Sequence, residues 1–273
     1  MSGNGPVRGR AIDRLRGLAW PMLPMAAAMA AMGGAFSNRA VFYVRDLAQF
    51  YYPLHIWYRE TVRSGASVLW DPYVGFGQSA IADPARNLMF PPVVLLRLLA
   101  PETLGFNLSV ALPFPLAALG AFALFRRRVS AQAAALGASV FALSGPVLST
   151  GSFLNMSWTL AVAPWVLLAA DRFVETGSGR RFAELAALIA LQLLAGEPVT
   201  FASTCAVAIG LSVVCARERG ERALRAARLL AATFAAYASG ACVAAVQLLP
   251  LVDATRRSAR ATTRPRWHSC SPA

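Results

Sequence analysis

Long apolar runs separated by short polar turns dominate the amino-acid sequence. Most of these runs are long enough for a helix to cross, or nearly cross, the apolar layer of a bilayer, which takes about 20 residues. The pattern therefore predicts an all-α fold, a polytopic transmembrane helical bundle of about seven spans. The expected spans are residues 18–36, 103–125, 131–149, 156–170, 182–195, 199–216 and 229–249.

Glycine and proline interrupt these runs at two places. Gly145 and Pro146 break the third run, and Gly196-Glu197-Pro198 forms a hinge between the fifth and the sixth. The first run follows an arginine-rich start, so it also fits a secretory signal peptide. Its length and the spans that follow favour an uncleaved first span.

The domain organisation that we expect is simple. Residues 1–257 form one membrane domain, in which residues 37–102 are a long loop with interfacial helices. Residues 258–273 contain no apolar run, and we expect an irregular tail. That tail is either a disordered terminus or the product of a truncated or frame-shifted gene.

Composition agrees with a membrane domain. Hydrophobic residues make up 57% of the 273 residues and charged residues only 14%, with a mean hydropathy of +0.51. A soluble domain carries nearly twice that charged fraction. The formal net charge is +13 and all basic residues are arginine. Because the arginines cluster between apolar runs, they indicate membrane orientation, and we expect no nucleic-acid partner.

The arginine clusters predict the orientation of the chain. With a cytoplasmic N-terminus and alternating spans, every cluster outside the long loop falls on the cytoplasmic side, as the positive-inside rule requires. The long loop then lies on the outer face of a bacterial inner membrane, in contact with the lipid bilayer. The clusters are residues 8–16, 126–128, 172–181 and 217–228.

The long loop begins with an amphipathic segment, residues 46–63. On a helical wheel its large apolar and aromatic side chains fall on one side and its polar side chains on the other. Pro53 suits the first turn of a helix, so we expect one helix or two short ones broken there. The apolar side holds Leu47, Phe50, Tyr51, Leu54, Trp57, Tyr58 and Val62, and the polar side holds Asp46, Gln49, Glu60 and Arg63.

Asp46 is the best catalytic candidate in the loop. At the membrane–water boundary its carboxylate could act as a general base or help to hold a divalent cation. The alternative is a helix N-cap or a solvated carboxylate. Asp71 and Asp83 each precede proline and favour turns. His55 falls between the two sides of the wheel and receives no role.

Two further charged residues could join Asp46. Arg97 lies on a short interfacial or re-entrant helix over residues 93–100, where it either meets a lipid phosphate or extends to the membrane surface. Glu197 lies at a hinge on the same outer face as Asp46, so the two could converge. The sequons at Asn107 and Asn155 lie in or beside apolar runs and are chance matches. The cysteines and histidines show no metal-binding spacing.

The order of short motifs resembles the YfhO family of bacterial membrane proteins, which belongs to the wider GT-C type of glycosyltransferase. The resemblance covers about residues 15–260. The motifs are Asp46-Leu47, Tyr51-Tyr52-Pro53, Gly65, Leu69-Trp70-Asp71-Pro72-Tyr73, Gly75-Phe76-Gly77, Ala82-Asp83-Pro84, Phe90-Pro91, residues 141–145, Pro164-Trp165, Asp171-Arg172, Gly196-Glu197-Pro198 and residues 247–260.

The resemblance implies a function and a set of site residues. In such proteins the acidic residue of the first outer loop is the presumed catalytic group, and this role maps onto Asp46. The implied donor is a polyprenyl-phosphate-linked sugar, transferred to an envelope acceptor. We expect Arg97, Tyr52, Asp71 and Glu197 to contact the substrate.

The sequence departs from the family in two respects. Glu197 and Val199 stand where the family has His and Gln. Family members are also considerably longer, so the chain resembles their N-terminal portion, and its activity on its own is an open question. Two other functions remain open, a membrane transporter or flippase and a non-catalytic membrane scaffold. A transporter would be expected to carry ionisable residues at mid-bilayer depth, which these spans lack.

Overall fold

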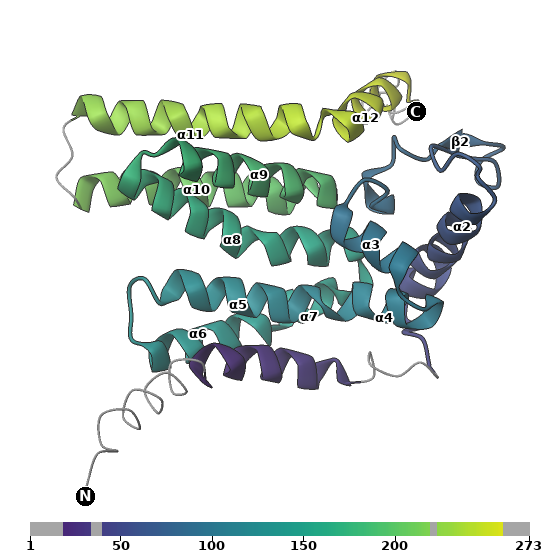
Figure 1. Cartoon of the computed structure of the whole chain (residues 1–273), viewed down its shortest axis with the longest axis horizontal. Coiled ribbons are helices and arrows are strands. Elements are labelled where there is room, and N and C mark those ends of the chain that lie inside the picture. Colours follow the sequence, from purple (N-terminus) through teal and green to yellow (C-terminus); the bar gives the residue numbers. More distant parts are fainter. Residues whose placement is uncertain (1–18, 34–39, 219–222, 259–273) are drawn as a thin grey trace, which may run out of the picture.

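A computed structural model describes residues 19–33, 40–218 and 223–258. The fold is all-α, with 79% helix and 2% strand, as the sequence predicts. Helices running back and forth form a bundle, and residues 41–102 form a cap over one end of it (Figure 1). The predicted tail, residues 258–273, lies outside the described residues except for Ser258.

The bundle is built from the helix Ala19–Ala31 and the helices that follow the cap. Most of them lie side by side along the long axis of the molecule (Figure 1). These helices are α4 (Glu102–Ala111), α5 (Pro113–Phe125), α6 (Ala131–Ala142), α7 (Gly145–Ser149), α8 (Leu154–Thr176), α9 (Gly179–Ala195), α10 (Pro198–Glu218) and α11 (Ala223–Val243), with the one-turn η4 (Thr150–Ser152) between α7 and α8.

Small residues let the helices approach closely. An added Cβ at Gly120 of α5 would lie 2.6 Å from the Trp165 indole nitrogen, and one at Gly240 of α11 would lie 2.6 Å from Ile189. Buried Val166, Ala169 and Leu185 belong to the core that α8, α9, α10 and α11 share. Close backbone approach at small residues is the common packing mode of membrane helices.

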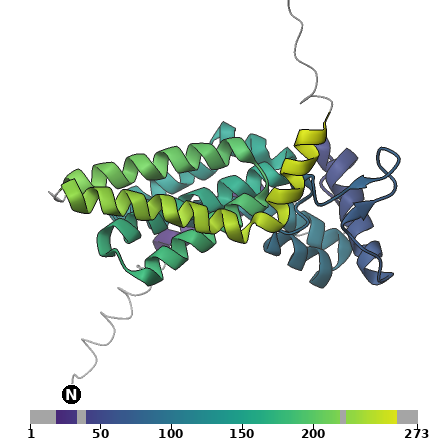
Figure 2. The same ribbon diagram turned by 90° about the horizontal axis from the view of Figure 1, so that it is seen from above.

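Two of the predicted spans are bent rather than continuous. Residues 131–149 form α6 and α7, inclined by 43° where Ser144 precedes Gly145 and Pro146. Residues 229–249 divide at Ala244, where α12 (Ala245–Arg257) turns by 79° from α11. Figure 2 shows α12 turning away at the capped end. The predicted span over residues 229–249 is therefore divided between two helices, and a single membrane crossing by this bent pair stays a prediction.

Fewer helices of the structure meet the length and hydropathy needed to cross a membrane than the sequence pattern predicts. Within the described residues, Glu102–Phe125 alone is long and apolar enough to cross a membrane, and up to three segments qualify if each bent pair is one span. The all-α prediction is therefore confirmed, whereas about seven spans stays a prediction.

The cap positions the loop residues. It comprises the π-helical turn η2 (Leu47–Tyr51), α2 (Tyr52–Arg63), the strands β1 (Trp70–Asp71) and β2 (Gln78–Ser79), η3 (Pro84–Arg86) and α3 (Pro91–Leu99). The strands pair antiparallel, with Trp70 opposite Ser79. Pro53 lies in the first turn of α2, as predicted. Buried Leu47, Tyr51, Leu54 and Tyr58 pack inward, so the apolar side of this segment contacts protein.

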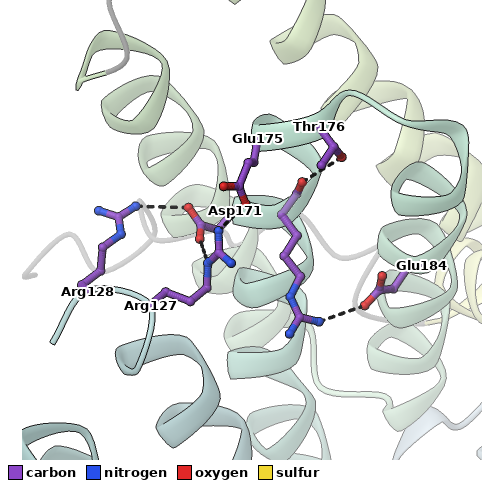
Figure 3. Close-up of polar contacts among 7 residues, drawn as sticks. Arg127, Arg128, Asp171, Glu175, Thr176 and Glu184 are labelled. Carbon is purple, nitrogen blue, oxygen red and sulfur yellow. Dashed lines mark hydrogen bonds and ion pairs between the residues drawn. The ribbon is translucent and has the colours of Figure 1, made fainter. Parts of the chain in front are cut away.

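The turns at the opposite end of the bundle carry arginines. The α5–α6 and α8–α9 turns lie there, at the left of Figure 1. Near them, Asp171 of α8 is 2% exposed and pairs with Arg127 and with Arg128, the latter at 3.1 Å. Figure 3 shows both guanidinium groups converging on this carboxylate. The predicted orientation assumes that successive helices run in opposite directions, so that the arginine clusters lie at one end. The helix directions agree with this, while the assignment of that end to the cytoplasm stays a prediction.

Candidate functional site

Asp46 lies where the cap meets the bundle, in an unusual backbone setting. Arg45 before it has a φ of 49°, in the left-handed region, and the turn after it is π-helical. A left-handed φ is uncommon for residues other than glycine, and π-helical turns are rare. Both features occur frequently at functional sites. The Arg45 guanidinium lies 5.8 Å from the Phe153 ring, which anchors this strained residue against the start of α8.

The Asp46 carboxylate is half-buried and uncommitted. It occupies the N-cap position of η2 but accepts no capping hydrogen bond. Within the described residues it has no hydrogen-bond or ion-pair partner. Asp46 therefore makes no capping hydrogen bond, and its catalytic role and the alternative of a solvated carboxylate both stay predictions. A carboxylate that stabilises no neighbour remains available to a substrate hydroxyl or to a cation.

Tyr51 and Asn155 form a hydrogen-bonded pair in the neighbourhood of Asp46. The Tyr51 hydroxyl donates to Asn155 Oδ1 at 2.8 Å, and Asn155 Nδ2 donates to the Gly196 carbonyl at 3.5 Å. Burial raises the pKa of Tyr51, and the charges of Asp46 and Asp83 raise it further, whereas the hydrogen bond with Asn155 opposes the shift. Tyr51 therefore remains a protonated donor, and Asp46 and Asp83 share its electrostatic surroundings.

Glu197 lies at the hinge between α9 and α10, where the backbone contacts the cap. Its carboxylate accepts hydrogen bonds from the amides of Val199, at 2.9 Å, and Thr200, so it caps α10. A Cβ at Gly196 would lie 2.2 Å from the Pro84 carbonyl oxygen, which shows how closely the hinge meets the cap. The hinge thus meets the cap at Pro84 and the Glu197 carboxylate caps α10, while its convergence with Asp46 stays a prediction.

Asp71 forms a buried ion pair. Its Oδ2 lies 2.6 Å from Arg86 Nη1, and both side chains are nearly inaccessible. Burial alone would raise the pKa of Asp71, but the hydrogen bonds from Arg86 and from the Tyr73 amide outweigh it and lower the pKa. The Tyr73 amide bond, at 2.9 Å, makes the turn that the Asp-Pro pair predicts. Asp83 makes a similar turn with Ala85.

Arg97 lies inside the cap, away from any surface. Its Nη2 donates to the Arg86 carbonyl at 3.0 Å and its Nη1 to the Asn87 carbonyl at 3.3 Å. The guanidinium lies 5.2 Å from the Tyr58 ring. Burial lowers its pKa to about 10. Arg97 therefore does not extend to a membrane surface, because this side of α3 faces the protein, and its predicted contact with a phosphate stays a prediction.

Tyr52 lies on the protein-facing side of the cap as well. Its ring meets Phe106 of α4 edge-on, at a centroid distance of 5.0 Å. It is half-buried and belongs to the apolar contact between α2 and the bundle. Its place is therefore structural in this conformation, and its predicted contact with substrate stays a prediction.

Sequence reasoning missed the buried side chains His55, Arg59 and Arg86. His55 is 1% exposed and its Nε2 has no hydrogen-bond partner in the described part of the chain. Arg59 donates to the carbonyls of Arg97 and of Ala100, the latter at 2.8 Å. The spacing of His55 and Arg59, four residues apart beside Tyr51 and Tyr58, was the available signal.

His55 makes the cap sensitive to acid. Burial and the charges of Arg97 and Arg59 lower its pKa to about 3, while a hydrogen bond with the Glu102 backbone acts the other way. The unfolded chain then binds a proton below about pH 6.5 that the folded chain excludes. We expect the wild-type protein to lose about 2 kcal/mol of stability between pH 7 and pH 5.

Unfolding of the purified protein in detergent at a series of pH values tests this expectation. A His55→Gln variant lacks the titrating group, so its stability should stay nearly constant between pH 7 and pH 5. The depressed pKa of Asp71 acts in a lower window, below about pH 4, where that carboxylate becomes protonated. Equal acid sensitivity of the wild type and His55→Gln would contradict this assignment.

Metal ligands are few around Asp46. Among the residues that the structure describes, no three His, Cys, Asp or Glu side chains form a group that could hold a metal ion. The divalent cation considered from the sequence stays a prediction.

Comparisons with known proteins add no assignment. No known protein family, curated protein or solved structure matches this chain. The argument for a function therefore depends on the geometry around Asp46 and on the arrangement of the cap and the bundle.

Proposed function

We propose that the chain forms the membrane-embedded catalytic part of a GT-C-type glycosyltransferase. The bundle crosses a bacterial inner membrane about seven times, with the N-terminus in the cytoplasm and the cap outside. The arrangement supports this, since arginine-bearing turns lie at one end of the bundle and the cap lies at the other (Figure 1). Arginine-rich turns on the cytoplasmic side agree with the positive-inside rule.

In this proposal Asp46 acts on the acceptor. A hydroxyl oxygen of an envelope acceptor attacks the anomeric carbon of a polyprenyl-phosphate-linked sugar. The bond between that carbon and the phosphate oxygen breaks, and polyprenyl phosphate leaves with the electron pair. Asp46 takes the hydroxyl proton, or helps to hold a cation beside the phosphate. The observation that carries this role is the Asp46 carboxylate, which has no partner among the described residues and lies between Arg45 and a π-helical turn.

Replacement of Asp46 by asparagine tests the proposal, because asparagine keeps the size but removes the basic oxygen. We expect sugar transfer to fall by at least about 100-fold, the usual contribution of a general base. The measurement is transfer from a labelled polyprenyl-phosphate-linked sugar, with the protein in proteoliposomes supplied with envelope acceptor.

Glu60→Gln is the matched control, because Glu60 is an exposed carboxylate on the adjoining helix α2. This variant should retain wild-type transfer. Unchanged transfer by Asp46→Asn at equal protein level would end the proposal. Movement of the lipid-linked sugar across the bilayer without any transfer would favour a flippase instead.

A further inference from the structure

A small cavity opens between the first turns of the cap and its hairpin. Its volume is about 180 Å³, smaller than most drug-sized sites and suited to a single ring. It lies on the cap, beyond the helices of the bundle. Its lining residues are Gln49, Phe50, Pro53, Leu54, Trp57, Asp71, Tyr73, Val74 and Arg86.

Three aromatic rings border this cavity. Phe50 and Trp57 come from η2 and α2, and Tyr73 comes from the hairpin. Tyr73 is 85% exposed, so its ring and hydroxyl are available to a ligand. Aromatic faces carry partial negative charge and attract the weakly positive C–H groups of a sugar ring. An exposed aromatic residue at a cavity edge is thus suited to stacking.

The polar groups of the cavity favour a neutral ligand. The charge of Arg86 is compensated by Asp71 at 2.6 Å and by Asp83 at 3.4 Å, so little positive charge remains for a phosphate. The Asp71 carboxylate keeps acceptor sites beyond its bonds to Arg86 and Tyr73. The exposed Gln49 amide adds both donors and acceptors. Hydroxyl groups match these partners, whereas an anion does not.

The cavity also lies on the helix that carries Asp46. Gln49 and Phe50 belong to the π-helical turn η2, which begins directly after Asp46. The cavity therefore begins within about one helical turn of Asp46 along the chain, so a saccharide longer than one ring could extend toward this carboxylate.

We infer that this cavity binds a neutral hexose ring and that, on the proposed function, the ring belongs to a saccharide acceptor. Phe50, Trp57 and Tyr73 stack on the ring, while Gln49 and the outer oxygen sites of Asp71 bind its hydroxyls. Asp46 then meets the hydroxyl of the neighbouring ring, the one that receives the transferred sugar. The acceptor is thereby assigned to the class of neutral oligosaccharides.

Binding of neutral trisaccharides to the purified protein tests the inference. The probes are maltotriose, mannotriose and the N-acetylglucosamine trimer. Their binding is followed by calorimetry and by the tryptophan fluorescence of the protein, to which Trp57 contributes as one of six tryptophans. At least one probe should bind with a Kd of about 10 mM or tighter. Tyr73→Ala should weaken that probe by about 3- to 10-fold, the effect of losing one aromatic contact. Absence of binding by all three probes would overturn the inference.

Phe76→Ala is the matched control, because Phe76 is fully exposed on the same hairpin and does not line the cavity. Its Kd should change by less than about twofold, within the range of a neutral surface change. Equal weakening by Phe76→Ala and Tyr73→Ala would also overturn the inference. An active Asp46→Asn enzyme removes the proposed function alone, whereas unaltered binding by Tyr73→Ala removes this inference alone.

Discussion

Replacement of Gly196 by alanine is expected to lower the free energy of unfolding by about 4 kcal/mol. Gly196 has a φ of 87°, in the left-handed region, where an alanine costs about 1–2 kcal/mol. Its new Cβ would also lie 2.2 Å from the Pro84 carbonyl oxygen, and relief of such a clash costs about 1–3 kcal/mol more. The cap must then move away from the hinge, which also displaces Asn155 from Tyr51.

Gly177→Ala separates the two causes. Gly177 ends α8 with a φ of 62°, yet its added Cβ would meet only Leu229, at 3.9 Å. This variant should lose about 1 kcal/mol, the backbone cost alone. Thermal unfolding of both variants in detergent micelles measures the difference. Similar losses of stability for both variants would show that Pro84 moves away from the new Cβ at no cost in free energy.

Replacement of Asp171 by asparagine is expected to destabilise the far end of the bundle by about 3 kcal/mol. Asp171 is buried and pairs with Arg127 and Arg128 (Figure 3). Breaking a buried ion pair by removing one partner costs about 3–5 kcal/mol. The two arginine side chains are 26% and 44% exposed, so water can solvate their unpaired charges. The loss of stability therefore stays near the lower end of this range.

Asp253→Asn is the control for this prediction. Asp253 pairs with Arg257 at 3.0 Å, but their side chains are 60% and 79% exposed. Exposed pairs one helical turn apart contribute no more than about 0.5 kcal/mol. Chemical unfolding in a mild detergent should therefore separate the two aspartates clearly. A loss below about 1 kcal/mol for Asp171→Asn would mean that the carboxylate contributes no more than a surface pair.

Much of the fold could be predicted from residue patterns alone. Apolar runs located most bundle helices within a few residues, and Pro53 located the start of α2. The exceptions are α8, which ends six residues after its run, and α11, which begins and ends six residues before its own. These features are local, because a helix depends on periodicity and on its end residues. The turn at Ala244 was not predictable in this way, since no glycine or proline marks it.

The site could be predicted only in part, because its contacts join distant segments. Asp46 was identified from its place on the helical wheel, but its lack of a partner within residues 19–33, 40–218 and 223–258 is a property of the packed structure. The Tyr51–Asn155 hydrogen bond joins residues 104 positions apart. Burial of Arg97 and His55 depends on which side of α2 and α3 meets the bundle. Helical periodicity names an apolar side without saying whether lipid or protein covers it.

The contacts between cap and hinge link Asp46 mechanically to the helices. Asn87 donates to the Ala195 carbonyl at 2.7 Å, Tyr51 bonds Asn155, and Pro84 lies against Gly196. These contacts reach the start of α8 and the end of α9, two helices that run to the arginine-bearing end. A rotation of either helix about its axis would therefore pull on Tyr51 or Asn87, so the position of the cap that carries Asp46 depends on how α8 and α9 are packed.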